Sequence, residues 1–143
     1  MIFPDQARSS RAELSPGHPV GVTEVMIETL VRAFYVKVRA DDQLGPVFAA
    51  AIPGDWEPHL RKMFDFWSSV TLMSGRYHGT PMQAHARQAA IQGEHFARWL
   101  ELFEATARQV CPPAAADLFI DRARRIGESL KIGLAIARGE LKL

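Results

Sequence analysis

Apolar side chains recur at steps of three and four residues through most of this chain, a spacing that places them along one face of an α-helix. The clearest series follows Thr23, a residue type that often caps helix N-termini, and it predicts a helix over 24–39. Its members are Ile27, Leu30, Val31, Phe34 and Val38. No stretch alternates apolar and polar residues over the length of a strand. The sequence therefore predicts an all-α protein.

The same spacing predicts further helices over 56–73, 81–91, 96–110 and 114–138. A Cys-Pro-Pro run at 111–113 is expected to end the helix before it. Residues 40–56 read ADDQLGPVFAAAIPGDW, and their Gly-Pro and Pro-Gly-Asp steps are typical of turns. We therefore expect a loop there, which carries the large apolar residue Phe48.

Length and composition favour one globular domain. The chain has 143 residues, of which 48% are hydrophobic and 23% charged. Residues 1–21 are rich in Pro and Gly and are predicted to be a flexible leader, with the folded domain over 22–143. The formal net charge is +1 without a long basic run, so we expect no nucleic-acid partner. No apolar run suits a signal peptide or a membrane span, so we expect a cytoplasmic protein without a membrane partner.

The metal-ligating residues limit which metal the chain could hold. A single cysteine, Cys111, excludes an internal disulfide and any multi-cysteine zinc site. The five histidines form neither an HExxH motif nor an i,i+4 pair, so a zinc site is not expected. His85 stands apart in the run GTPMQAHARQAA. A metal that needs one protein ligand and an apolar surrounding, such as haem iron, would fit a histidine of this kind.

Polar atoms are mixed into the aromatic stripes. Tyr35 follows the core-facing Phe34, His59 lies one turn before Met63, and Trp99 precedes an apolar position. A hydroxyl, an imidazole and an indole N–H each need a hydrogen-bond partner when buried. These groups could satisfy one another, or they could converge on a polar ligand.

Four segments appear in a particular order along the chain: FYVKVRADDQLGPVF at 34–48, WEPHLRKMFDFW at 56–67, YHGTPMQAH at 77–85 and HFARWLELF at 95–103. Together they resemble the group III truncated (2-on-2) haemoglobins, and the resemblance extends over about residues 23–130. The Gly-Gly motifs that mark groups I and II are absent from the sequence.

The resemblance implies a globin-like 2-on-2 helical sandwich around haem b (iron protoporphyrin IX). It implies that His85 is the proximal ligand of the iron. It places four residues on the distal side: Tyr35, His59, Met63 and Trp99. It also suggests a set of haem contacts: Phe34, Phe48, Lys62, Phe64, Trp67, Tyr77 and Phe96. Lys62 and Arg61 are candidates to meet the propionates, and a solvated charge is the alternative for each.

The implied function is binding of O₂ and other diatomic gases, including CO and NO. We expect Tyr35 to be the chief hydrogen-bond donor to the gas and Trp99 the second, with His59 either a donor or a gate. Detoxification of NO or peroxide would require an external reductase, because the sequence has no flavin or nicotinamide motif. The alternatives are a haem-based redox or gas sensor and a cofactor-free helical interaction domain.

Overall fold

A computed structural model describes residues 13–79 and 92–139, and within these residues every element of secondary structure is helical. The elements are η1 (His18–Val20), α2 (Glu24–Ala40), α3 (Leu44–Ala51), α4 (Glu57–Leu72), α6 (Gly93–Val110) and α7 (Pro113–Ala137). In these parts of the chain, no helix is both long and apolar enough to cross a membrane. The predicted all-α class is confirmed.

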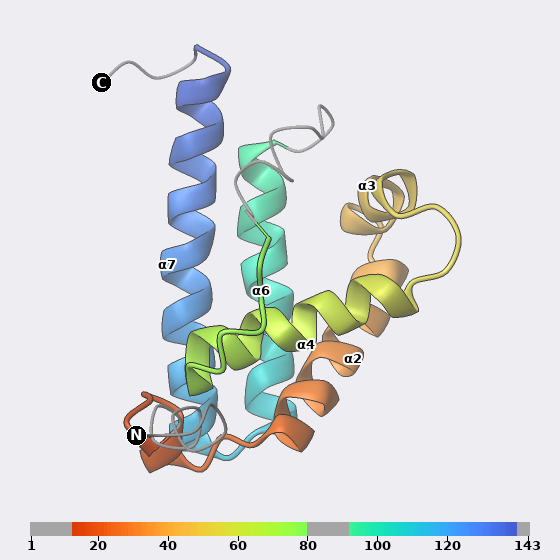
Figure 1. Cartoon of the computed structure of the whole chain (residues 1–143). Helices are drawn as coiled ribbons and strands as arrows, with labels where there is room; N and C mark the ends of the chain where they lie inside the picture. The colour runs from red at the N-terminus through yellow and green to blue at the C-terminus, as the bar shows by residue number, and fades with distance from the viewer. Residues whose placement is uncertain (1–12, 80–91, 140–143) are drawn as a thin grey trace.

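The helices form two crossed layers (Figure 1). α6 and α7 lie side by side and run in opposite directions, because only a short turn separates them, and α2 and α4 cross this pair. α2 packs against both α4 and α6, so it links the two layers. This arrangement is the 2-on-2 sandwich expected of a truncated globin.

The helices predicted from spacing lie within a few residues of their expected positions. α2 begins after Thr23, whose Oγ1 accepts a hydrogen bond from the Met26 N–H at 3.1 Å. α6 ends at Cys111, where the following prolines stop the helix. The predicted helix over 81–91 lies outside the described residues.

Cys111 is buried, and burial raises the pKa of its thiol to about 11, so the thiol is neutral at ordinary pH.

The prediction of a loop over the whole of 40–56 was wrong, because residues 44–51 form α3. The Asp41 carboxylate accepts hydrogen bonds from the N–H groups of Gln43 (3.1 Å) and Leu44 (2.9 Å) and so begins the helix. Pro46 stands in the first turn, where an N–H group would have no partner within the helix. The Gly-Pro step therefore starts a helix here instead of a turn.

Part of the predicted leader packs against the end of α4. Ser15 and Gly17 are buried, and the Gly17 N–H donates to the Thr71 carbonyl at 2.8 Å. A Cβ atom at Gly17 would lie 2.6 Å from that oxygen, so only glycine fits this approach. The extent of a flexible leader within 1–21 stays a prediction, and residues 1–12 lie outside the described part.

The core is centred on Phe103 of α6, which is completely buried. Its ring stacks between the indoles of Trp67 (centroid distance 5.0 Å) and Trp99 (5.5 Å). Phe34 of α2 meets the same ring edge-on at 5.2 Å. Full burial of a phenylalanine side chain contributes about 1.5–3 kcal/mol. These contacts join α2, α4 and α6.

An ion pair fixes the corner between α2 and α3 against α6. Arg98 donates from Nε (2.8 Å) and Nη2 (2.6 Å) to one carboxylate oxygen of Asp41, whose side chain is only 6% exposed. The hydrogen bonds from Arg98 lower the pKa of the Asp41 carboxyl, and those from the backbone lower it further.

We expect Asp41→Asn to reduce the free energy of unfolding by about 1–2 kcal/mol at pH 7, because the amide keeps a capping oxygen but loses the ion pair. The pKa of Asp41 is lower in the folded state than its ordinary value of about 3.9, so its contribution is complete above that pH and disappears as the pH falls further. Urea unfolding should therefore show wild type and variant converging below about pH 4.

Asp42→Asn is the matched control, because Asp42 is adjacent in sequence and exposed. It should change the free energy of unfolding by less than about 0.5 kcal/mol. Equal effects of the two substitutions would show that the Asp41–Arg98 pair does not stabilise the fold.

Candidate functional site

Tyr35 lies in an aromatic enclosure near the end of α2 and is 7% exposed. Its ring centroid lies 5.0 Å from that of Phe34, 6.0 Å from Phe48 and 5.9 Å from Trp56. Burial raises the pKa of the Tyr35 phenol. The hydroxyl makes no hydrogen bond to any residue in the described ranges 13–79 and 92–139. Tyr35 is therefore a neutral donor in largely apolar surroundings.

His59 shares this enclosure from the first turn of α4. Its ring is nearly perpendicular to that of Tyr35 (86°, centroid distance 5.1 Å) and to that of Trp56 (86°, 5.8 Å). The Nε2 atom is buried, although the residue as a whole is half-buried. The structure thus brings together two of the predicted distal residues, which are 24 positions apart in sequence.

Trp99 approaches from α6 and also contacts Phe34. Its indole stacks on Phe103 with a 15° angle between the planes and meets Phe34 edge-on at 5.7 Å. Phe34 contacts both Tyr35 and Trp99, so one ring links the two predicted donors. The three polar-bearing rings therefore belong to one connected aromatic cluster.

The other predicted pocket residues differ in their surroundings. Met63 packs against the core from α4, and Phe96 is half-buried in the first turn of α6. Phe64 is 8% exposed and lies under the guanidinium of Arg32, which is 5.1 Å from the ring centroid. Lys62 is exposed on α4. Their roles as haem contacts stay predictions.

Two further predicted contacts lie toward the end of α4. Trp67 is 4% exposed and is enclosed by Phe103, by Phe66 at 5.4 Å and by Phe119 at 5.8 Å. Tyr77 follows α4 and meets Phe66 edge-on at 5.1 Å. His85, the predicted iron ligand, lies outside the described residues, so its role also stays a prediction.

Trp56 belongs to the site but was not predicted as a site residue. Its indole contacts Tyr35, His59 and Phe48, and its other neighbour is the guanidinium of Arg39, 4.7 Å from the ring centroid. The signal that could have identified it is its position three residues before His59, one turn away along the same helical stripe. Trp56 also lines an open cavity of about 310 Å³ together with Arg39.

The sequence model of the bacterial-like globin family matches residues 18–126. Over 108 residues the chain is 33% identical to a group 3 truncated haemoglobin from Campylobacter jejuni, an alignment that covers 73% of this chain and 85% of that protein. The chain belongs to the group III truncated haemoglobins. The resemblance noted in the sequence is thus confirmed.

Solved structures agree with this assignment. The crystal structure of the group III truncated haemoglobin from C. jejuni superimposes with a TM-score of 0.75 and 33% identity, covering 79% of this globin and 91% of that chain. A group II truncated haemoglobin from Bacillus anthracis gives a TM-score of 0.63 at 24% identity, covering 81% and 89%. The second match supports the fold alone.

Membership of the globin family implies a protein that binds diatomic gases at haem. The described residues fit that cofactor. The Tyr35 phenol makes no hydrogen bond to them, so its hydroxyl can donate to a bound ligand. The surrounding Phe and Trp rings supply the apolar walls that a porphyrin requires.

The two tyrosines of this globin should titrate separately. Burial raises the pKa of both, but Tyr77 is half-buried and Tyr35 almost fully buried. Ultraviolet difference absorbance of the haem-free protein should therefore show tyrosinate forming first at Tyr77. Tyr77→Phe should abolish this step and Tyr35→Phe should leave it unchanged.

The same shifts give a direction for stability. Tyrosine in the unfolded chain ionises near its ordinary pKa of about 10, before the folded phenols do, so the free energy of unfolding should fall as pH rises above that value. In the absorbance titration, the buried position of Tyr35 would be contradicted if the first tyrosinate step persisted in Tyr77→Phe and disappeared in Tyr35→Phe.

Proposed function

We propose that this globin binds O₂ and other diatomic gases, including CO and NO, at haem b, with Tyr35 as the chief hydrogen-bond donor to the gas. The observation that supports this most directly is the Tyr35 side chain, which is 7% exposed, packs beside His59 and makes no hydrogen bond to the described residues. Haem, when bound, supplies an iron atom that binds the gas and transfers negative charge to it.

His85 is the proposed proximal ligand. Support comes from its place in YHGTPMQAH, which is one of the four segments that resemble the group III truncated haemoglobins. Its ring would bind iron through Nε2 in the neutral form, while the other nitrogen donates to an oxygen acceptor that fixes the tautomer. Alanines stand on both sides of it in sequence and add little bulk.

The distal residues act through preorganised donors. A phenol with a raised pKa stays protonated, so it can donate to a gas molecule that carries partial negative charge. A hydrogen bond to a charged acceptor contributes about 1.5–3 kcal/mol, which corresponds to about 10- to 100-fold in dissociation rate. Trp99 is the proposed second donor, and His59 either donates to the gas or opens a path to solvent.

A gas held by such donors leaves slowly, which suits reaction within the pocket better than transport. We therefore propose detoxification of NO or peroxide as the physiological role. Either reaction consumes electrons, so an external reductase would have to supply them. The polar groups of Tyr35 and His59 face the same enclosure and could assist cleavage of an O–O bond by donating a proton.

The cofactor assignment is tested by the visible spectrum of the purified protein. We expect one haem per chain with a strong Soret band, and we expect His85→Ala to lose haem or to change its axial coordination. His78→Ala is a suitable control, because that histidine is nearby in sequence and exposed. A wild-type protein that stays colourless with added hemin would overturn the proposal.

The donor assignment is tested by O₂ dissociation measured by stopped flow. Tyr35→Phe removes one hydroxyl and should accelerate release about 10- to 100-fold. Tyr77→Phe makes the same chemical change at the other tyrosine of the chain, a predicted haem contact that is not a proposed donor to the gas, and should alter the rate less than about threefold. Trp99→Phe should accelerate release by a smaller factor than Tyr35→Phe. An unchanged rate in Tyr35→Phe rejects its role.

A further inference from the structure

The segment 73–79 leaves α4 through two left-handed residues and precedes in sequence the stretch that contains His85. Met73 caps α4 with φ 56°, and Gly75 follows with φ 71°. No described residue of this segment belongs to a helix or strand. Its path therefore depends on side-chain and backbone contacts, and the side chain of Arg76 makes those that reach furthest along the chain.

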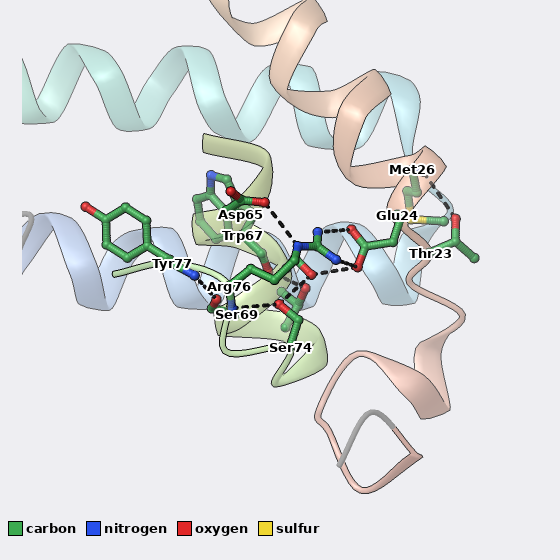
Figure 2. Close-up of polar contacts among 11 residues, drawn as sticks. Thr23, Glu24, Met26, Asp65, Trp67, Ser69, Ser74, Arg76 and Tyr77 are labelled. Atoms are coloured by element: carbon green, nitrogen blue, oxygen red, sulfur yellow. Dashed lines mark hydrogen bonds and ion pairs between the residues drawn. The ribbon is translucent and has the colours of Figure 1, made fainter. Parts of the chain in front are cut away.

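Arg76 joins the segment to both helices of one layer (Figure 2). Its Nη1 and Nη2 donate to the two carboxylate oxygens of Glu24, at the start of α2, at 3.3 and 2.9 Å. Its Nε donates to Asp65 of α4 at 3.0 Å. A guanidinium that uses a two-pronged contact on one carboxylate and a third bond on another has little freedom to rotate.

Three serines extend the network to the backbone. Ser68 of α4 is fully buried and donates to Glu24 at 2.6 Å, and its hydroxyl lies 2.9 Å from that of Ser74. The Arg76 N–H donates to Ser74 at 3.4 Å, and the Tyr77 N–H donates to Ser69 at 3.0 Å. The backbone is thus attached to α4 directly at Tyr77 and indirectly at Arg76, through the Ser74 hydroxyl that meets Ser68 (Figure 2).

The network also sets the position of an aromatic ring. Tyr77 is the next residue after Arg76, and its ring meets Phe66 edge-on at 5.1 Å. Phe66 contacts Trp67, which stacks on Phe103 at the centre of the core. The position of residues 76 and 77 is therefore coupled to the aromatic core and not only to surface charges.

We propose that Arg76 is a positioning residue for the proximal side of the haem pocket. By bridging Glu24 and Asp65 it fixes the point from which the chain enters the segment that carries His85. This inference rests on the proposed haem function. The ion pairs are about 42–45% exposed, so they add little to overall stability, and their effect is on local geometry.

The test compares Arg76→Gln with Arg76→Lys and with Arg108→Gln. Arg108 is the matched control, because it forms an exposed ion pair with Asp117 on the α6–α7 pair. The readouts are the iron–histidine stretching band of the ferrous protein, by resonance Raman, and the rate of haem transfer to an apoglobin acceptor. We expect Arg76→Gln to shift the band and to speed haem loss about 10-fold.

Arg108→Gln should leave both readouts at their wild-type values. Arg76→Lys keeps the positive charge, so its band and haem-loss rate should lie between those of wild type and those of Arg76→Gln. If Arg76→Gln does not fold, Glu24→Gln and Asp65→Asn each remove one partner and should give smaller changes in the same direction. The inference is overturned if Arg76→Gln gives the same stretching band and the same haem-loss rate as Arg108→Gln. If Arg76→Gln does not fold, the same result for Glu24→Gln and Asp65→Asn overturns it. Either result leaves the proposed haem function standing. Failure of wild type to bind haem would overturn both the proposed function and this inference.

Discussion

The stacking of Phe103 between two indoles is the contact on which the rest of this globin depends. Trp67 comes from α4 and Trp99 from α6, so the stack fixes how one layer of helices crosses the other. Phe34 meets Phe103 edge-on and brings α2 to the same centre. Because Tyr35 is the next residue along α2, the crossing that buries Phe34 also fixes where the phenol lies relative to Trp99. The distal pocket is therefore a consequence of the core packing.

The same packing explains why the Tyr35 hydroxyl is suited to donate a hydrogen bond to a ligand. A hydroxyl surrounded by Phe34, Phe48 and Trp56 interacts with a ligand in a medium of low polarity, where a hydrogen bond is stronger than in water. The described residues do not accept a hydrogen bond from this hydroxyl, so it can donate to a ligand. Arg98 holds the end of α2, six residues after Tyr35, by binding Asp41. Ligand binding then satisfies a donor that is already in place.

Local signals in the sequence were enough for the long helices, and tertiary contacts decided the rest. The cap at Thr23 and the apolar spacing predicted α2 because both act within one or two turns. α3 was missed because Gly45-Pro46 is equally suited to a turn, and the deciding contact is the Asp41 carboxylate, itself held by Arg98 from α6. The pairing of Tyr35 with His59 came from family resemblance, since periodicity gives the face of a helix but not its partner. Trp56 was missed for the same reason.

One rigid element connects the two sides of the proposed pocket. His59, in the first turn of α4, faces Tyr35, while Asp65 and Ser69, further along the same helix, hold Arg76 and Tyr77. α4 has 16 residues, about 24 Å of helix, and its core contact through Trp67 lies between Asp65 and Ser69. A displacement of α4 would move the distal imidazole and the entry to the proximal segment together. Substitutions that only loosen the end of α4 should therefore affect gas binding through both sides of the pocket, whereas substitutions at Tyr35 should affect it through one.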